Sequence, residues 1–290
     1  MPEKNYAKKT LVMYHGDCSD GFGAAYSAWK IFGSDADYVP MFYAQEFIPD
    51  VINKDVYILD FSFDIEKYEN ILKNAKSVNL LDHHATAMKS LCNCKGCFFD
   101  LTKSGAVLSW EYFHPKEPVP KFLKLIQDGD LWKFKHEETK PFYSAINLIE
   151  KNFELWQKFE NDDYLQDFVN KGKLIQVNVD NQVRQLSHDS KTITLSGVVG
   201  LMVNAPPMFA SDVGNLLARQ SGTFGMVWHE HQHGIKCSLR SLAEYDVSVI
   251  AQEFGGGGHP QACGFNLHSL AELNFLIKHG HLKKHNKLKI

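Results

Sequence analysis

The sequence lacks the long apolar run that a membrane-spanning helix needs. No stretch approaches the roughly 18 to 20 uncharged apolar residues of such a helix, and the opening residues, MPEKNYAKKT, lack the apolar core of a signal peptide. Cysteine is also scarce, with six residues in a chain of 290, which is too long to depend on disulfide bonds. We therefore expect a cytoplasmic protein with reduced thiols and no membrane partner.

Positive charge is not in excess either. Aspartate and glutamate number 34 against 31 lysines and arginines, giving a formal net charge of −3. A chain without a global positive field is poorly suited to holding long nucleic acid by counterion release. Any nucleotide partner should therefore be short.

The order of apolar segments predicts two domains joined by a helix. In the first half, short apolar runs such as LVMYH, VYILDF and SVNLL alternate with segments of helical period. This alternation is typical of a parallel sheet with crossover helices. We expect a doubly wound α/β domain over residues 1–160, a helical connector over residues 161–190, and a smaller α+β domain over residues 191–290.

Acids and histidines follow three of the predicted strands. The carboxyl ends of parallel strands form the ligand crevice of an open sheet, so these side chains should converge. Several carboxylates tolerate one another only when cations neutralise them, and a mixed set with imidazole suits Mn²⁺, Zn²⁺, Mg²⁺ or Fe²⁺. Taken singly, an aspartate after a strand is more often a helix N-cap. The residues in question are His15, Asp17, Asp20, Asp60, Asp82, His83 and His84, with Asp128 and Asp130 in the later segment LIQDGDLW.

A second candidate site lies near the C-terminus. Four consecutive glycines, Gly255 to Gly258, precede His259. Ordering glycine is entropically costly, but its backbone can approach an anion closely. Arg240 and His259 would add charge-assisted hydrogen bonds to a phosphate. The alternative reading of the glycines alone is a flexible loop.

A third cluster, the segment CNCKGC, contains Cys92, Cys94 and Cys97. A small zinc site is one reading of these cysteines. No nearby histidine or zinc-ribbon pair completes four ligands, so we favour a turn with free thiols.

The string LLDHHA resembles the signature of the DHH phosphoesterases. Together with HGDCSDG, YILDF and IQDGD, it supplies the four motifs of that family in their usual order. The segment EFGGGGHPQACGF, preceded by CSLRS and DVSVIA, resembles the DHHA1 substrate-binding domain that accompanies many of these proteins. The resemblance covers most of the chain except the helical middle and the tail.

The resemblance implies a site with two divalent metal ions, usually Mn²⁺, and a phosphate clamp. Asp60 would bridge the two ions, Asp82 would orient His83, and His84 would donate a hydrogen bond to the scissile phosphate. The implied metal ligands are His15, Asp17, Asp20, Asp60, His83 and Asp128. The implied clamp, for the terminal phosphate of a small nucleotide, consists of Arg240, Gly256, Gly257, Gly258 and His259.

The first motif departs from the family pattern. Many relatives carry two aspartates separated by one residue before the glycine, and in that register the first falls on Cys18, with Asp17 one residue earlier. Asp17, Cys18 or a water molecule could complete the site, and we take Asp17 as the predicted ligand. A thiolate at Cys18 would favour softer metals such as Zn²⁺ or Fe²⁺.

The expected activity is hydrolysis of short oligoribonucleotides, or of linear dinucleotides such as pGpG, to mononucleotides by metal-activated water. Alternatives within the superfamily are a phosphatase acting on 3′-phosphoadenosine phosphate, a cyclic-dinucleotide phosphodiesterase and an inorganic pyrophosphatase. A non-enzymatic nucleotide sensor with a degenerate metal site is a further alternative. The sequence leaves both a monomer and a homodimer open.

Overall fold

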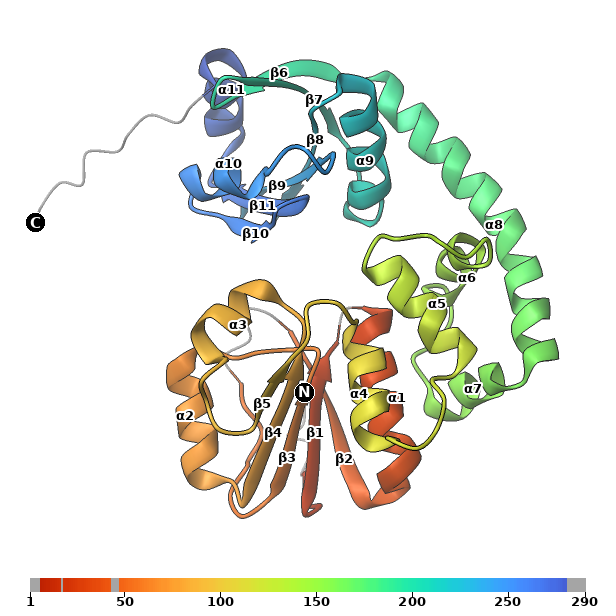
Figure 1. Ribbon diagram of the computed structural model, residues 1–290. Helices are drawn as coiled ribbons and strands as arrows, with labels where there is room; N and C mark the ends of the chain where they lie inside the picture. Colours follow the sequence, from red (N-terminus) through yellow and green to blue (C-terminus); the bar gives the residue numbers. More distant parts are fainter. Residues whose placement is uncertain (1–5, 17, 43–46, 281–290) are drawn as a thin grey trace, which may run out of the picture. The chain divides into compact units, whose positions relative to one another are not determined.

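The computed structural model describes residues 6–16, 18–42 and 47–280. The predicted ligand Asp17 lies outside the described residues. The chain divides into two compact units, Met1–Val177 and Asn178–Ile290. The division falls within α8 (Asp162–His188), a helix of 27 residues (Figure 1). None of the helices in the described ranges combines the length and the apolar character required to cross a membrane.

The N-terminal unit is built on a five-stranded parallel sheet. Its strand order is β2-β1-β3-β4-β5, and every paired strand runs parallel to its neighbour (Figure 1). This confirms the predicted parallel-sheet α/β architecture. The strands are β1 (Thr10–His15), β2 (Ala36–Met41), β3 (Asp55–Leu59), β4 (Ser77–Asp82) and β5 (Cys97–Phe99).

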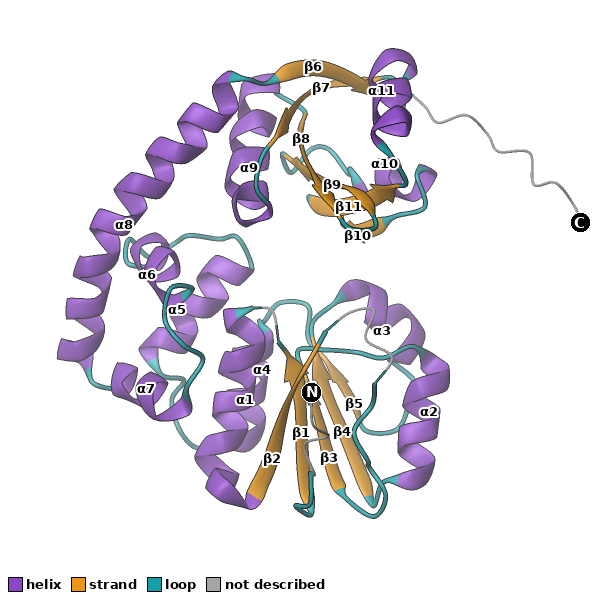
Figure 2. Cartoon of the chain, turned by 180° about the vertical axis from the view of Figure 1, so that it is seen from behind, coloured by secondary structure: helices purple, strands orange, loops and turns teal. Residues whose placement is uncertain are grey.

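Helices cover both faces of this sheet (Figures 1 and 2). Along β1, Val12 and Tyr14 pack into one core and Leu11 and Met13 into another. Burial on both faces explains why β1 reads as an uninterrupted apolar run. Each such side chain contributes about 1.5–3 kcal/mol when it is removed from water. One core includes α1 (Ser19–Phe32) and α4 (Gly105–Phe113), and the other includes α2 (Ile65–Asn74) and α3 (Ala85–Leu91).

Further helices extend the first of these cores. In α5 (Lys121–Asp130), the apolar residues Phe122, Leu125 and Ile126 recur at helical spacing and are buried against α1 and its neighbours. The start of α8 contributes Leu165 and Val169 to the same core. The intervening helices are α6 (Thr139–Ile146) and α7 (Phe153–Gln157).

The C-terminal unit is the predicted smaller α+β domain. Its six-stranded mixed sheet has the order β10-β11-β9-β8-β7-β6, with only β7 and β8 parallel among the paired strands described. α9 (Ala210–Ser221) packs on one face, and α10 (Ser248–Glu253) and α11 (Leu270–His279) pack on the other. The strands are β6 (Lys191–Leu195), β7 (Val198–Asn204), β8 (Phe224–His231), β9 (Gly234–Ser241), β10 (Gly257–His259) and β11 (Ala262–Leu267).

Candidate metal centre and phosphate site

The candidate metal centre lies where the strand order of the parallel sheet reverses. The chain passes from β1 to β2 on one side and then returns to β3 on the other side of β1. Ligands of open α/β sheets bind at the carboxyl ends of strands at such a switch point. His15 ends β1, and Asp60 directly follows β3, so both residues lie at this edge.

Asp60 holds a backbone conformation that few residues adopt. Its φ is 53°, in the left-handed region, and its N–H donates to Leu81 O over 2.9 Å. Aspartate tolerates this region better than most residues, and such strain is concentrated at functional sites. The turn leaves the Asp60 side chain only 1% exposed among the other acids and histidines.

One group of candidate ligands consists of His15, Cys18 and Asp60. The Cys18 Sγ lies 3.2 Å from His15 Nδ1 and 3.4 Å from Asp60 Oδ2. The distance from His15 Nδ1 to Asp60 Oδ2 is 3.6 Å. A nitrogen, a sulfur and an oxygen therefore come together in a small volume, each within 4.8 Å of the others.

A second group surrounds the ring of His83. Its Nε2 lies 3.1 Å from Asp60 Oδ1, 3.6 Å from Asp20 Oδ2 and 3.7 Å from Asp130 Oδ2. The side chains of Asp20 and Asp60 are 1% exposed, whereas that of Asp130 is 24% exposed. Because Asp60 belongs to both groups, its carboxylate lies between them, as a bridging ligand would.

Asp20 is fixed by the start of α4. Its Oδ2 accepts from Gly105 N over 2.6 Å, and its Oδ1 accepts from Ala106 N over 3.0 Å. A helix N-terminus favours a negative charge in this position. Gly105 is in turn confined, because a Cβ added there would lie 2.4 Å from Asp60 Cβ.

Asp82 holds the ring of His84 rather than that of His83. Its Oδ1 lies 2.6 Å from His84 Nδ1 and accepts from the backbone N–H of His83 over 2.7 Å. Its Oδ2 accepts from Ser62 Oγ. The expected partnership of Asp82 with His83 is therefore made only through the main chain, and the carboxylate orients His84.

Asp128, predicted as a metal ligand, lies outside both groups. Its Oδ1 accepts from Lys135 N over 3.0 Å. Its Oδ2 accepts from His136 N over 3.0 Å and from Thr139 Oγ1 over 2.6 Å. The carboxylate therefore organises the loop between α5 and α6, and Asp130 supplies the carboxylate beside His83. Two residues in a helix differ by about 200° in direction, so the two acids cannot face one site.

The electrostatics of the cluster favour an added positive charge. Burial raises the pKa of Asp20 well above its ordinary value, and the neighbouring carboxylates of Asp60 and Asp130 raise it further. Burial likewise raises the pKa of Asp130 to about 6. For Asp60, burial is outweighed by the neighbouring imidazoles of His15 and His83, which lower its pKa. Burial opposes protonation of His83, yet the surrounding carboxylates raise its pKa to about 10.

A buried oxygen of Asp60 shows whether the site is suited to a metal ion. Among the described residues, Asp60 Oδ1 makes no hydrogen bond, although His83 Nε2 lies 3.1 Å away. Such an atom is costly to bury. A divalent cation would satisfy it, and the surrounding imidazole, thiol and carboxylate atoms are suitable ligands. The residues therefore fit a divalent metal ion.

The candidate phosphate site lies on the sheet of the C-terminal unit. Arg240 in β9 and His259 in β10 both pair with Ala262 of β11, so their side chains share one face of the sheet. The Arg240 guanidinium donates to Ser211 Oγ over 2.9 Å and to Leu239 O over 2.8 Å. Burial lowers the pKa of Arg240 from its ordinary value.

The glycine run forms a turn and a short strand. Gly258 has a φ of 137°, in a region that side chains rarely adopt. A Cβ at Gly256 would lie 2.1 Å from Gly264 O, whereas one at Gly257 would meet nothing within 4 Å. The Gly256 N–H donates to Ala251 O over 2.8 Å. Close backbone packing accounts for Gly256 and Gly258, whereas Gly255 and Gly257 have open space beside them.

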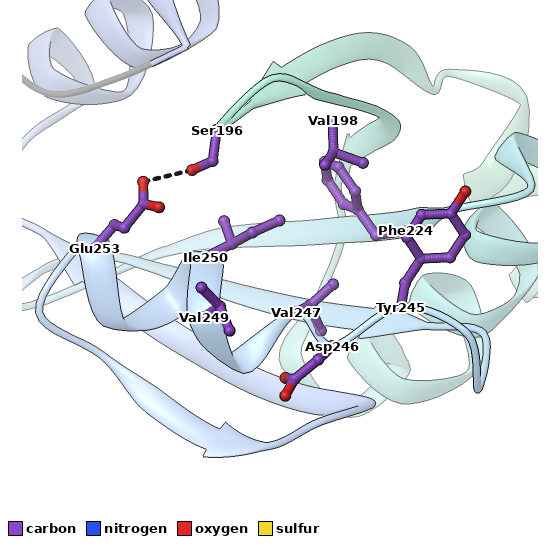
Figure 3. A pocket seen from close by; sticks show the side chains of 9 residues that line it. All are labelled: Ser196, Val198, Phe224, Tyr245, Asp246, Val247, Val249, Ile250 and Glu253. Carbon is purple, nitrogen blue, oxygen red and sulfur yellow. Dashed lines mark hydrogen bonds between the residues drawn. The ribbon is translucent and has the colours of Figure 1, made fainter.

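A separate pocket of about 300 Å³ lies beside α10 (Figure 3). Its acids are engaged within the protein: Glu253 accepts from Ser196 Oγ over 2.6 Å, and Asp246 accepts from Ser248. No predicted site residue lines this pocket. Its lining consists of Ser196, Val198, Phe224, Tyr245, Asp246, Val247, Val249, Ile250 and Glu253.

These features define a class of protein, with a parallel α/β unit whose carboxylate and histidine cluster can hold divalent metal, followed by a smaller α+β unit. Residues 206–280 match the DHHA1 domain family. Uncharacterized protein R106 of Acanthamoeba polyphaga mimivirus is 34% identical over 283 residues, covering 88% of this chain and 66% of its own. Oligoribonuclease NrnB of Bacillus subtilis strain 168 is 23% identical over 239 residues, covering 73% of this chain and 59% of its own. The chain thus spans just under two thirds of the first relative's length and less of the second's.

Two solved structures share the fold. The pGpG-specific phosphodiesterase PggH from Vibrio cholerae has a TM-score of 0.54 and 14% identity, over 93% of this chain and 97% of its own. An exopolyphosphatase-related protein from Bacteroides fragilis has a TM-score of 0.51 and 15% identity, over 93% of this chain and 90% of its own. The DHHA1 match over residues 206–280 and the similarity to NrnB support the DHH/DHHA1 superfamily, in agreement with the resemblance of the sequence motifs.

Proposed function

We propose that this protein is a metal-dependent phosphodiesterase that hydrolyses short oligoribonucleotides or linear dinucleotides, such as pGpG, to mononucleotides. The observation that carries the proposal is the buried cluster around Asp60, whose Oδ1 has no hydrogen-bond partner in the described part of the chain. The names of two similar proteins support the substrate class: one is an oligoribonuclease and the other a pGpG-specific phosphodiesterase.

Two divalent ions, with Mn²⁺ as the first choice, would be held on either side of Asp60. His15, with Asp17 or Cys18, would hold one ion; Asp20, His83 and Asp130 would hold the other. Asp130 replaces Asp128 in the predicted set of metal ligands, because Asp130 lies beside His83. Bound metal would supply a water of lowered pKa and stabilise negative charge on the phosphate.

The remaining residues of the site position the substrate. Asp82 holds His84 at Nδ1 and so fixes the ring, which can present its other nitrogen to a phosphate oxygen. The His84 side chain is 25% exposed, whereas Asp82 is fully buried. His84 is therefore the donor to the scissile phosphate, and Asp82 acts through it.

The C-terminal unit binds the terminal phosphate in this proposal. Arg240 uses two of its hydrogen bonds within the protein, and a guanidinium has five N–H groups to offer. Its planar fork can hold two phosphate oxygens at once. His259, on the same sheet face, would add a second donor; the open space beside Gly257 gives the phosphate room, and Gly256 and Gly258 allow the close backbone packing of the turn.

The experiment is a turnover assay with Mn²⁺ and 5′-phosphorylated oligoribonucleotides from dimers to hexamers. We expect mononucleotide release, fastest from the shortest substrates, and indifference to every dinucleotide would defeat the proposal. The panel also contains 3′-phosphoadenosine phosphate, cyclic dinucleotides and pyrophosphate, so preference for one of these identifies a rival activity. Nucleotide binding without product would indicate a sensor.

Two histidine variants make the assay specific to the site. His83→Ala removes the imidazole that lies among three carboxylates, so we expect most activity to disappear while the fold remains. His268→Ala is the matched control, because His268 is exposed and lies in the other unit. Equal rates in both variants would contradict the assignment of His83.

A further inference from the structure

Cys18 lies at the candidate metal centre, in a position where the family pattern has an aspartate. Its Sγ is 3.2 Å from His15 Nδ1 and 3.4 Å from Asp60 Oδ2. The sulfur, the imidazole nitrogen and the carboxylate oxygen lie within 4.8 Å of one another. Such a set resembles the mixed N, S and O donors of transition-metal sites more than the all-oxygen sets of Mg²⁺.

The neighbouring carboxylate supplies an independent sign of a ligand. Asp60 is 1% exposed; its Oδ2 faces Cys18 and His15, and its Oδ1 lies 3.1 Å from His83 Nε2 and makes no hydrogen bond among the residues with described structure. A carboxylate whose two oxygens face different groups of candidate ligands is suited to two cations. The sulfur therefore lies beside a carboxylate that itself calls for a cation.

Helix capping does not explain a sulfur at this position. Cys18 is the N-cap of α1, and its Sγ accepts from Gly21 N over 3.2 Å. Serine, threonine, aspartate and asparagine cap helices well, and a thiol is only a weak acceptor. A cap would require contact with the backbone amide alone, whereas this sulfur also contacts His15 and Asp60.

We infer that Cys18 is a thiolate ligand of the cation shared by His15 and Asp60, and that it gives this position a preference for Zn²⁺, Fe²⁺ or Co²⁺ over Mn²⁺ and Mg²⁺. The inference rests on the proposed metal centre. On coordination, the S–H bond breaks, its proton passes to solvent and the sulfur lone pair binds the cation. The group around His83, which contributes one nitrogen and several carboxylate oxygens, retains the harder preference.

The test is a Co²⁺ titration of the metal-free full chain, followed by its near-ultraviolet spectrum. Sulfur bound to Co²⁺ gives a charge-transfer band, which nitrogen and oxygen ligands do not. We expect the band in the native protein and its loss in Cys18→Ser, which keeps a capping hydroxyl. In competition titrations, Cys18→Ser should bind Zn²⁺ about 10- to 100-fold more weakly, with Mn²⁺ affinity changed less than about threefold.

Other thiols and a loss of folding are controlled by two further variants. Cys92 and Cys94 follow α3 and Cys97 begins β5 in the same unit, so the triple serine variant tests whether they supply the sulfur. A band that persists in Cys18→Ser and disappears in the triple variant overturns the inference. If Cys18→Ser does not fold, Cys18→Asp is used instead, because aspartate also caps the helix. We expect Cys18→Asp to bind Mn²⁺ more tightly than Zn²⁺. An unchanged order of affinities overturns the inference.

The outcomes separate this inference from the proposed function. A sulfur band with no hydrolysis under any cation refutes the phosphodiesterase and leaves the thiolate ligand standing. Hydrolysis without a sulfur band refutes the thiolate ligand and leaves the phosphodiesterase standing.

Discussion

Gly105 should be essential to the metal centre although it contributes no side chain. Its N–H donates to Asp20 Oδ2, and a Cβ there would lie 2.4 Å from Asp60 Cβ and 2.6 Å from Asp60 Oδ1. Nonbonded carbons prefer about 3.5–4.0 Å, so Gly105→Ala requires a displacement of about 1 Å. Helix propensity does not disfavour alanine at this first position of α4, and the φ of Gly105 is not positive. Any loss of activity or of metal affinity in Gly105→Ala therefore indicates that the cluster has been displaced.

A displacement of about 1 Å can lower a rate about 100-fold. We expect Gly105→Ala to reduce kcat/KM for a 5′-phosphorylated dinucleotide by about that factor and to weaken Mn²⁺ binding measured by calorimetry. Gly200→Ala is the control, because its Cβ would lie 2.6 Å from the Phe224 ring in the C-terminal unit and so crowds a core without meeting the metal cluster. Native rate and metal affinity in Gly105→Ala would refute the reasoning.

Three further predictions concern the acids of α5, the phosphate site and metal removal. Asp130→Asn should abolish most activity with little change in stability. Asp128→Asn should destabilise the protein by about 1–3 kcal/mol through its lost loop contacts. Urea unfolding and turnover of both variants check this, and the reverse pattern would indicate that Asp128 is the ligand. Arg240→Lys should raise KM about tenfold with kcat nearly unchanged, because one charge-assisted hydrogen bond of the fork is lost; an unchanged KM would speak against the phosphate site. Chelation should lower the melting temperature, since a ligand at a hundred times its Kd stabilises by about 2.7 kcal/mol; calorimetry with and without Mn²⁺ measures this, and equal melting temperatures would contradict it.

The sequence predicted the sheet, and it predicted that the candidate ligands lie at one edge of it, because both follow from local patterns. Runs of apolar residues identified the strands, and His15, Asp60 and His83 fell at their ends. Parallel pairing then brings strand ends together whatever the intervening helices do. The motif resemblance added the C-terminal domain, which the DHHA1 match confirms.

The details that depend on side-chain direction could not be predicted in this way. Asp128 and Asp130 share one short motif, and only the packing of α5 decides which faces His83. The apolar spacing of α5 was a usable signal, because Asp130 lies about 200° around the helix from Asp128. Gly105 gave no signal at all, since its role is a close approach between α4 and Asp60.

Counting the metal ions bound by the chain tests whether bound cations neutralise the buried acids. The protein is dialysed to equilibrium against Mn²⁺ or Zn²⁺, and bound metal is determined by mass spectrometry for the native chain and for Asp60→Asn. Two divalent ions per native chain are expected, with at least one lost from Asp60→Asn. A folded native chain that retains no divalent ion would contradict the metal centre and the hydrolytic function proposed for it.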